Sequence, residues 1–273
     1  MNPLNSNWFS FVTFFLLFSC GDNNFKDRYD LGPARILGVY FDLPEISPGS
    51  TATVNAIVSF EDQTTETLES RLRYCPDPGL AFGVDPTCEQ QPGTTLLYDW
   101  TPLSFSDPAV KTQILNSMGA ITAPADFLNQ SGDAEKLQGK IILVEYSIRV
   151  SGTLTSSAFS RLRVSDPTLK PQKNLNPILN DVLINQVALS ARPATLTGEL
   201  GVSFDSSSLQ TGEELLTSFY VSKGKVKYPR IIGSQTTTWD ITAQENLESA
   251  TLTVVAVGRD ENGGLAVQIK TGL

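Results

Sequence analysis

Three cysteines are the residues of this chain best able to form covalent bonds, and they stand at positions 20, 75 and 88. No two of them form a C-x-x-C pair, so the sequence predicts neither a structural zinc site nor thioredoxin-like redox chemistry. The chain contains no histidine, the usual general base near neutral pH and a common metal ligand. Histidine-dependent triads and histidine-metal sites are therefore excluded, and we expect no catalytic residue, metal ion or cofactor.

Catalysis without histidine needs a serine activated by a lysine or a pair of carboxylates. Ser222 with Lys223, or Lys111 with a nearby serine, are the candidates for the first arrangement. No acidic cluster stands among aromatic residues as a sugar-cleaving cleft requires. The enzyme alternative is an exported hydrolase with a site near the segment 101–138, and we favour a protein without catalysis.

Two further groups of residues have a binding interpretation beside a structural one. Asp260, Glu261 and Asn262 carry oxygen atoms suited to calcium, but their spacing matches no EF-hand loop, and a hairpin turn is the favoured interpretation. Trp100 and Trp239 are candidates for carbohydrate stacking or for packing in a core. We expect Trp239 to pack in a core, whereas both interpretations remain for Trp100.

The charge of the chain limits its partners. Twenty Lys and Arg residues stand against 29 Asp and Glu residues, which gives a formal net charge of -9. Long-range repulsion from a phosphate backbone follows, so no nucleic-acid partner is expected.

The first twenty residues have the pattern of a targeting signal. Residues 8–18 form an apolar run interrupted only by Ser10 and Thr13, and the run stops at Ser19 and Cys20. At about 1.5 Å per residue the run is shorter than the roughly 30 Å core of a bilayer. It is typical of the apolar region of a signal peptide.

The residues Leu17-Phe18-Ser19-Cys20-Gly21 resemble the lipobox of bacterial lipoproteins. The resemblance implies cleavage between Ser19 and Cys20 and acylation of Cys20, which would anchor the chain to a membrane. The alternatives are an ordinary secretory signal with an incidental Cys20, and an uncleaved anchor. If Cys20 carries lipid, Cys75 and Cys88 remain as a pair in an oxidising compartment, and we expect a disulfide between them.

After the signal, apolar residues recur mostly at every second position in short runs separated by Pro, Gly, Asp and Ser, the pattern of an all-β sandwich. A helix is expected at 107–118, where Asp107 can cap, Pro108 suits the first turn and Gly119 can end it. A hairpin turn is expected at 260–264. The strands are expected at 34–41, 50–60, 68–75, 94–100, 140–150, 156–164, 183–191, 199–204, 215–223, 236–241, 250–259 and 265–271.

Several sequence segments resemble those of bacterial surface lipoproteins with immunoglobulin-like or PKD-like modules. They are ARILGVYFDLPEISPGSTATVNAIV, YCPD, APADFL, NLNPIL and FYVSKG with VVAVGRDENGGLAV. The resemblance implies a fold and an envelope location, and it implies no activity. The runs that start at Leu143 and Leu252 have a similar strand pattern, which indicates two related modules.

The expected organisation has two immunoglobulin-like β-sandwich domains in tandem. A signal peptide at 1–19 and a tether at 20–32 precede the first domain at 33–165, which has an irregular insertion near 101–138. A Pro- and Asn-rich linker at 166–177 leads to the second domain at 178–273. We expect a lipid-anchored protein of the bacterial cell envelope, with the outer membrane favoured and with an envelope protein or a glycan as the partner.

Overall fold

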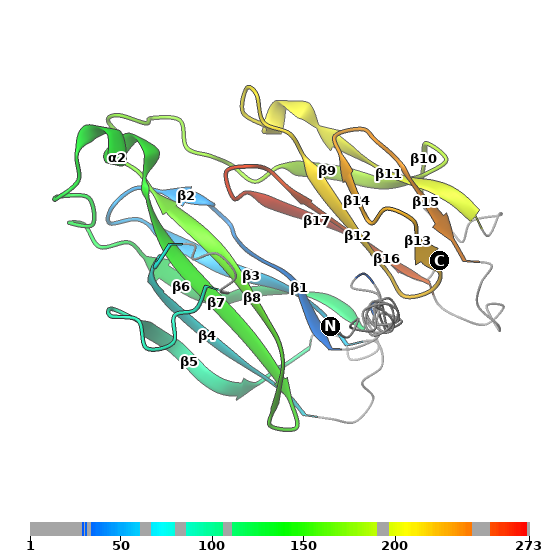
Figure 1. Cartoon of the computed structure of the whole chain (residues 1–273), viewed down its shortest axis with the longest axis horizontal. Coiled ribbons are helices and arrows are strands. Elements are labelled where there is room, and N and C mark those ends of the chain that lie inside the picture. The colour runs from blue at the N-terminus through cyan, green and yellow to red at the C-terminus, as the bar shows by residue number, and fades with distance from the viewer. Residues whose placement is uncertain are drawn as a thin grey trace, which may run out of the picture.

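The structure is a computed structural model that describes residues 29, 31, 34–60, 67–79, 86–105, 111–189, 197–241 and 252–271. In these residues the chain is almost entirely β-strand, and its four sheets form two sandwiches side by side (Figure 1). We call the sandwich of strands β1 to β8 the first module and that of strands β9 to β17 the second module. The all-β class predicted from the sequence is confirmed.

The first module consists of a three-stranded and a five-stranded sheet. The three-stranded sheet has the order β1-β3-β6 and contains β1 (Arg35–Phe41), β3 (Thr51–Ser59) and β6 (Thr112–Thr122). The five-stranded sheet has the order β2-β8-β7-β4-β5 and contains β2 (Glu45–Ile46), β4 (Leu68–Pro76), β5 (Thr95–Pro102), β7 (Lys140–Val150) and β8 (Thr153–Val164). Neighbouring strands are antiparallel except β2, which runs parallel to β8. A short helix, α2 (Asp133–Gln138), precedes β7.

The second module repeats this plan. One sheet has the order β10-β9-β11-β15-β13, with β9 (Ile178–Ile184), β10 (Val187–Ala188), β11 (Thr197–Asp205), β13 (Lys225–Val226) and β15 (Thr237–Asp240). The other, called here the four-stranded sheet, has the order β14-β12-β16-β17, with β12 (Leu216–Val221), β14 (Arg230–Ile232), β16 (Thr253–Arg259) and β17 (Leu265–Thr271). A turn of 3-10 helix, η1 (Ser206–Ser208), follows β11.

The strand orders of the two modules correspond. The order β1-β3-β6 in the first matches β9-β11-β15 in the second, and β8-β7-β4-β5 matches β17-β16-β12-β14. Two antiparallel sheets whose connections cross between them form an immunoglobulin-like arrangement. The similar sequence runs that start at Leu143 and Leu252 lie in β7 and at the start of β16, which are equivalent strands.

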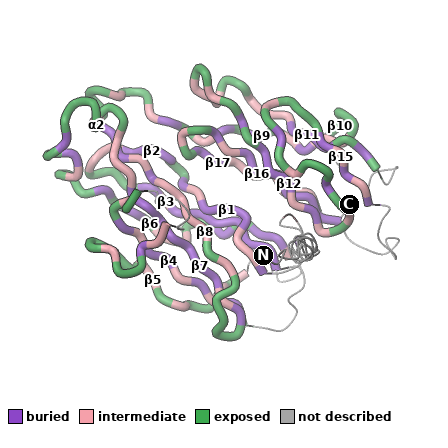
Figure 2. Tube along the Cα trace, viewed as in Figure 1, coloured by how far each residue is buried: buried purple, intermediate pink, exposed green. Residues whose placement is uncertain are grey.

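Each module has its own apolar core because its strands alternate between an inner and an outer face. In β7 the inner residues Ile142, Val144, Tyr146 and Ile148 are buried in the first core. The second core includes Trp239, as expected, and its indole N–H donates to the Lys223 carbonyl at 3.0 Å. Figure 2 shows these buried stretches along the strands of both modules.

The helix expected at 107–118 is wrong. Residues 106–110 lie outside the described residues, and Thr112–Thr122 forms strand β6, which pairs along β3 from Thr112 opposite Ser59 to Thr122 opposite Thr51. Long-range pairing outweighs the local helix signals. Gly119 lies within β6 and not at the end of a helix. A Cβ there would lie 2.9 Å from the Leu72 side chain, so the glycine allows the two sheets to pack closely.

The strand expected at 183–191 is displaced. β9 ends at Ile184, and Asn185 and Gln186 both have positive φ, which makes a two-residue turn into β10. The short strands β13 and β14 were not predicted, since they have only two and three residues. The turn expected at 260–264 does connect β16 and β17.

The two modules pack against each other through the outer faces of two sheets. Leu37 of β1 and Ile57 of β3 lie in one apolar cluster with Val255 and Val257 of β16 and Leu265 of β17. All five are at most 4% exposed. The modules therefore share a third apolar layer between their own cores.

Candidate functional site

The residues predicted to be cleaved and acylated, Ser19 and Cys20, lie outside the described residues, so the anchor stays a prediction. In the described part of the chain, no helix has the length and apolar character needed to cross a membrane.

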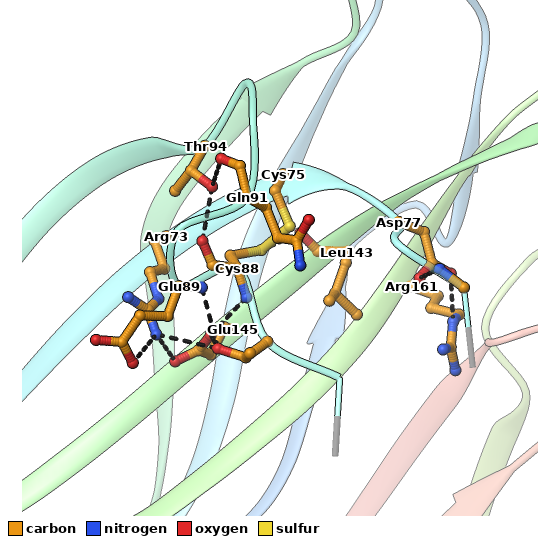
Figure 3. Close-up of a disulfide and its surroundings, with 12 residues drawn as sticks. Arg73, Cys75, Asp77, Cys88, Glu89, Gln91, Thr94, Leu143, Glu145 and Arg161 are labelled. Carbon is orange, nitrogen blue, oxygen red and sulfur yellow. Dashed lines mark hydrogen bonds and ion pairs between the residues drawn. A yellow bond between two sulfur atoms is a disulfide. The ribbon is translucent and has the colours of Figure 1, made fainter. Parts of the chain in front are cut away.

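The other two cysteines form a disulfide. Cys75 near the end of β4 is joined to Cys88 with a Cα–Cα separation of 5.5 Å, and both residues are fully buried (Figure 3). They pack with Leu143 of β7 and Phe159 of β8. The disulfide thus holds the chain after β4 over the outer face of the five-stranded sheet.

A buried carboxylate fixes the same segment. Glu145, on the outer face of β7, accepts hydrogen bonds from Arg73 at 2.6 Å, from the Cys88 backbone N–H at 3.0 Å and from the Thr87 hydroxyl at 3.0 Å (Figure 3). Burial alone would raise the pKa of Glu145, but the Arg73 guanidinium and the Cys88 N–H bring it below its usual value. The carboxylate is therefore ionised where it anchors the loop.

Further along this face, Trp100 of β5 lies in contact with two guanidinium groups. The Arg71 and Arg149 guanidinium carbons are 4.6 and 4.5 Å from the ring centroid, and Arg149 also binds Glu69 at 2.7 Å. We call Arg71, Trp100 and Arg149 the arginine–tryptophan stack. Trp100 is half-buried on the sheet surface, with its ring occupied by intramolecular cation–π contacts.

The Asp260 carboxylate accepts hydrogen bonds from its own turn and from the segment that connects the two modules. One carboxylate oxygen accepts from the Asn262 and Gly264 backbone N–H groups at 2.9 and 2.7 Å, and the other accepts from the Asn174 amide at 3.2 Å. Burial raises the pKa of Asp260. These contacts match the hairpin interpretation of the turn, and no group of three potential metal ligands occurs in the described ranges.

The serine–lysine candidates also have structural partners. The Ser222 hydroxyl accepts from the Thr253 N–H at 2.9 Å, and the Ser222 N–H donates to the Thr253 carbonyl at 3.0 Å. The Lys111 ammonium lies 5.5 Å from the centroid of the Phe60 ring. The segment 101–138, named for the hydrolase alternative, contributes β6 to the three-stranded sheet.

The predicted linker is fixed by a set of polar groups, called here the polar clasp: the buried Glu45, Ser165 and Asn174 and the partly exposed Lys170 and Lys173. Glu45 is the centre, since it accepts from Lys170 at 2.8 Å, from the Asn174 N–H at 2.8 Å and from the Ser165 hydroxyl. Lys173 donates to the Ser165 carbonyl at 2.8 Å. Because Asn174 also donates to Asp260, the clasp joins β2 of the first module to the β16–β17 turn of the second.

The end of the predicted tether is also bound. Leu31 is fully buried in the apolar layer between the modules; its N–H donates to the Val221 carbonyl at 3.1 Å, and the Val221 N–H donates to the Tyr29 carbonyl at 3.1 Å. The Ser59 hydroxyl donates to the Leu31 carbonyl at 3.0 Å. Leu31 thus contacts both modules near Ser59 and Val221, at the strand ends that lie away from β2 and the β16–β17 turn, where the polar clasp is.

A cleft of about 510 Å³ lies at the junction of the modules. Its walls are β1, β8 and the β16–β17 turn, and it contains Arg161, Arg163 and Arg259. This cleft could not be predicted from the sequence, because its residues come from four strands or turns spread over distant parts of the chain. The alternation of Arg161 and Arg163 in β8 is the one local signal, since residues two apart share a face.

No protein-family model and no curated protein matches the chain. Among solved structures it is similar to Spo0M, a sporulation control protein of Bacillus subtilis, at 13% identity and a TM-score of 0.31 over 88% of this chain and 91% of that one. A BSP domain of a biofilm-associated protein matches at 8% identity and 0.29 over 86% and 58%. A transglutaminase of red sea bream matches at 11% identity and 0.26 over 86% and 30%. Likenesses this weak carry no inference about function.

Proposed function

We propose that this chain is an exported bacterial lipoprotein without catalytic activity. Its acylated Cys20 anchors two β-sandwich modules at the cell envelope, and the outer membrane is the favoured location. The modules act as one rigid body that presents surfaces to an envelope protein or a glycan. Nucleic acid and metal cofactors have no part in this function.

The proposal is supported by the contacts that hold the two modules to each other and to Leu31, at the end of the predicted tether. An apolar layer, the polar clasp and the contacts of Leu31 hold the junction at both ends and in the middle. A flexible tandem would place its surfaces at random distances and angles, whereas this one keeps them fixed. A fixed geometry suits display from a single anchor.

The disulfide adds support for export. Structural disulfides form and persist in oxidising compartments and are rare in the cytosol. Here both cysteines are buried and pack against Leu143 and Phe159 of the first module. Two acyl chains or more would then anchor the chain firmly, since each buried methylene contributes about 0.8 kcal/mol.

The test is the intact mass and membrane fractionation of the natively expressed full chain. We expect the wild type to lack residues 1–19, to carry acyl chains and to fractionate with membranes, while Cys20→Ser is unprocessed or unlipidated. Ser19→Ala is the matched control, because it keeps a small residue before the cysteine and should be processed normally. An unlipidated wild type with a different first residue would overturn the proposal.

A second candidate, an adhesin-like or glycan-binding role, has one favouring observation. The outer face of the five-stranded sheet carries Glu69 and the arginine–tryptophan stack. The Arg71, Glu69 and Arg149 side chains are 19%, 20% and 26% exposed. Charged and aromatic groups on an ordered sheet suit recognition of a polar partner. The test compares how well cells that carry the wild type or Arg71→Ala with Arg149→Ala attach to a glycan-coated surface, at equal protein level. Reduced attachment of the variant would support this role, and unchanged attachment would contradict it.

A further inference from the structure

The junction cleft exists only when both modules are in place. Ile36 to Val39 of β1 and Ala158 to Arg161 of β8 form the walls from the first module, and residues 259–265 close it from the second. A Cβ on Gly263 would lie 3.5 Å from the Arg161 carbonyl oxygen, which measures how closely the turn approaches β8. The fixed junction therefore preserves the shape of the cleft.

Three arginines and two carboxylates, Asp260 and Glu261, line the cleft. Arg161 and Arg163 lie two residues apart on the outer face of β8, and Arg259 comes from the end of β16. The acidic groups near them are Asp77, which binds Arg161 at 2.8 Å, Asp260, whose oxygens accept the hydrogen bonds of the turn, and Glu261, which is exposed. Of these three carboxylates, Asp77 is the one that forms an ion pair with an arginine of the cleft, and Asp260 is engaged by the backbone of the turn.

The guanidinium groups are held in place by the protein, yet they keep unused donors. Arg163 donates from Nη1 to the Asn262 amide oxygen at 3.2 Å, and Arg259 donates from Nη2 to the Leu37 carbonyl at 3.1 Å. Arg161 Nη2 and Arg163 Nε are buried and have no hydrogen-bond partner among the described residues. A buried N–H without an acceptor is costly, and an oxyanion would supply the acceptor.

We propose that the junction cleft binds a small ligand through a carboxylate or phosphate group, with Arg161 and Arg163 as the principal donors. The planar guanidinium group matches both oxyanions in geometry. The volume falls within the range of small-molecule sites, and Leu37, Val39, Ile141 and Phe159 give the ligand an apolar wall. This binding site does not depend on the lipid anchor, so the experiment that tests it is separate from the test of the proposed function.

The test is calorimetric titration of the exported full chain in detergent, with glucuronate, inorganic phosphate and uncharged glucose as probes. We expect saturable binding of glucuronate or phosphate and none of glucose; which anion binds more tightly identifies the oxyanion. Arg161→Gln with Arg163→Gln should weaken binding at least tenfold. Arg230→Gln, an exposed arginine of β14, is the matched control and should leave the affinity unchanged.

Hydrogen exchange of the wild type provides a measurement that does not depend on the variants folding. The bound anion should slow exchange in peptides that cover 158–163 and 259–265 and leave β9 and β11 unchanged. Absence of saturable binding by both anions, equal weakening by Arg230→Gln, or protection confined to other segments would overturn the proposal.

Discussion

The five-stranded sheet of the first module and the four-stranded sheet of the second hold equivalent places in their sandwiches, but their outer faces have different chemistry. The outer residues of β7 include Glu145, Ser147 and Arg149, whereas those of β16 include Val255 and Val257. The first face is covered in part by the disulfide loop and ordered by ion pairs. The second is covered by the first module's three-stranded sheet.

The difference shows how one fold serves two purposes. A strand that is apolar on both faces requires cover on both, and β16 is buried from Thr253 to Gly258. A strand with charged outer residues needs partners for its charges, which β7 finds in Arg73 and Glu69. The second module uses this face to join its neighbour, and the first keeps it for the loop and for solvent.

The largest expected effect comes from a charge placed in the apolar layer. Val255→Asp should lower the free energy of unfolding by about 3–5 kcal/mol, because it places a charge at a fully buried position within an apolar cluster. Val254 and Ala256 face the second core and are unchanged, so the modules should separate before either unfolds. Denaturant unfolding should then show two transitions.

Leu216→Asp is the control for that change. Leu216 lies on the neighbouring strand β12 and is 37% exposed, so the substitution should alter stability by no more than about 0.5 kcal/mol. A single unchanged transition in Val255→Asp would contradict the role given to the apolar layer.

Removal of the disulfide acts on the other sheet. Cys75→Ala with Cys88→Ala opens a loop of sequence separation 13 and should cost about 3 kcal/mol. Exchange of backbone amides should rise around Leu143 and Phe159, which pack against the two cysteines, while Val255 and Val257 keep their protection. Equal loss of protection in both sheets would mean that the loop supports the whole tandem.

The charged face should depend on pH in a way that the apolar layer does not. The pKa of Glu145 in the folded protein lies below its unfolded value of about 4.3, so its contribution is fully present above that value and is lost as pH falls through the folded pKa. Glu145→Gln should cost about 1–3 kcal/mol at neutral pH and flatten the decline of stability in acid. Thermal unfolding at a series of pH values measures both effects.

Glu135→Gln is the matched control, because this carboxylate of α2 is 51% exposed and lies 3.8 Å from the Lys140 ammonium. It should leave the pH profile unchanged, within about 0.5 kcal/mol. An acid profile that Glu145→Gln does not change would show that the loop is held by the disulfide alone.

The smallest effect is expected for the arginine–tryptophan stack. Trp100→Ala removes two cation–π contacts at a half-buried position and should cost about 1 kcal/mol. Trp100→Phe keeps a ring and should recover part of the loss in denaturant unfolding. A cost as large as that of the disulfide would place Trp100 among the main supports of the sheet.

Much of the fold follows from local patterns in the sequence. The period-two alternation of Lys140–Val150 and the turn at Asp260 predict β7 and the last hairpin, because each strand's own residues specify its two faces. The helix predicted at 107–118 is wrong because residues 112–122 form β6 by pairing with β3, a strand far earlier in the chain that local signals do not reveal. The linker at 166–177 is predicted from its composition, but its fixation could not be predicted for a similar reason: Glu45, which binds it, lies far away in sequence.

The sequence by itself determined the all-β class, most strand positions, the even pair of cysteines and the absence of histidine chemistry. These depend on residue type and on spacing over a few positions. Only the tertiary structure decided which outer face is covered by another module, that Leu31 and Asn174 are buried at the junction, and that three arginines meet in one cleft. Such features arise between segments far apart in the chain, where burial and charge are set by the neighbours that folding supplies.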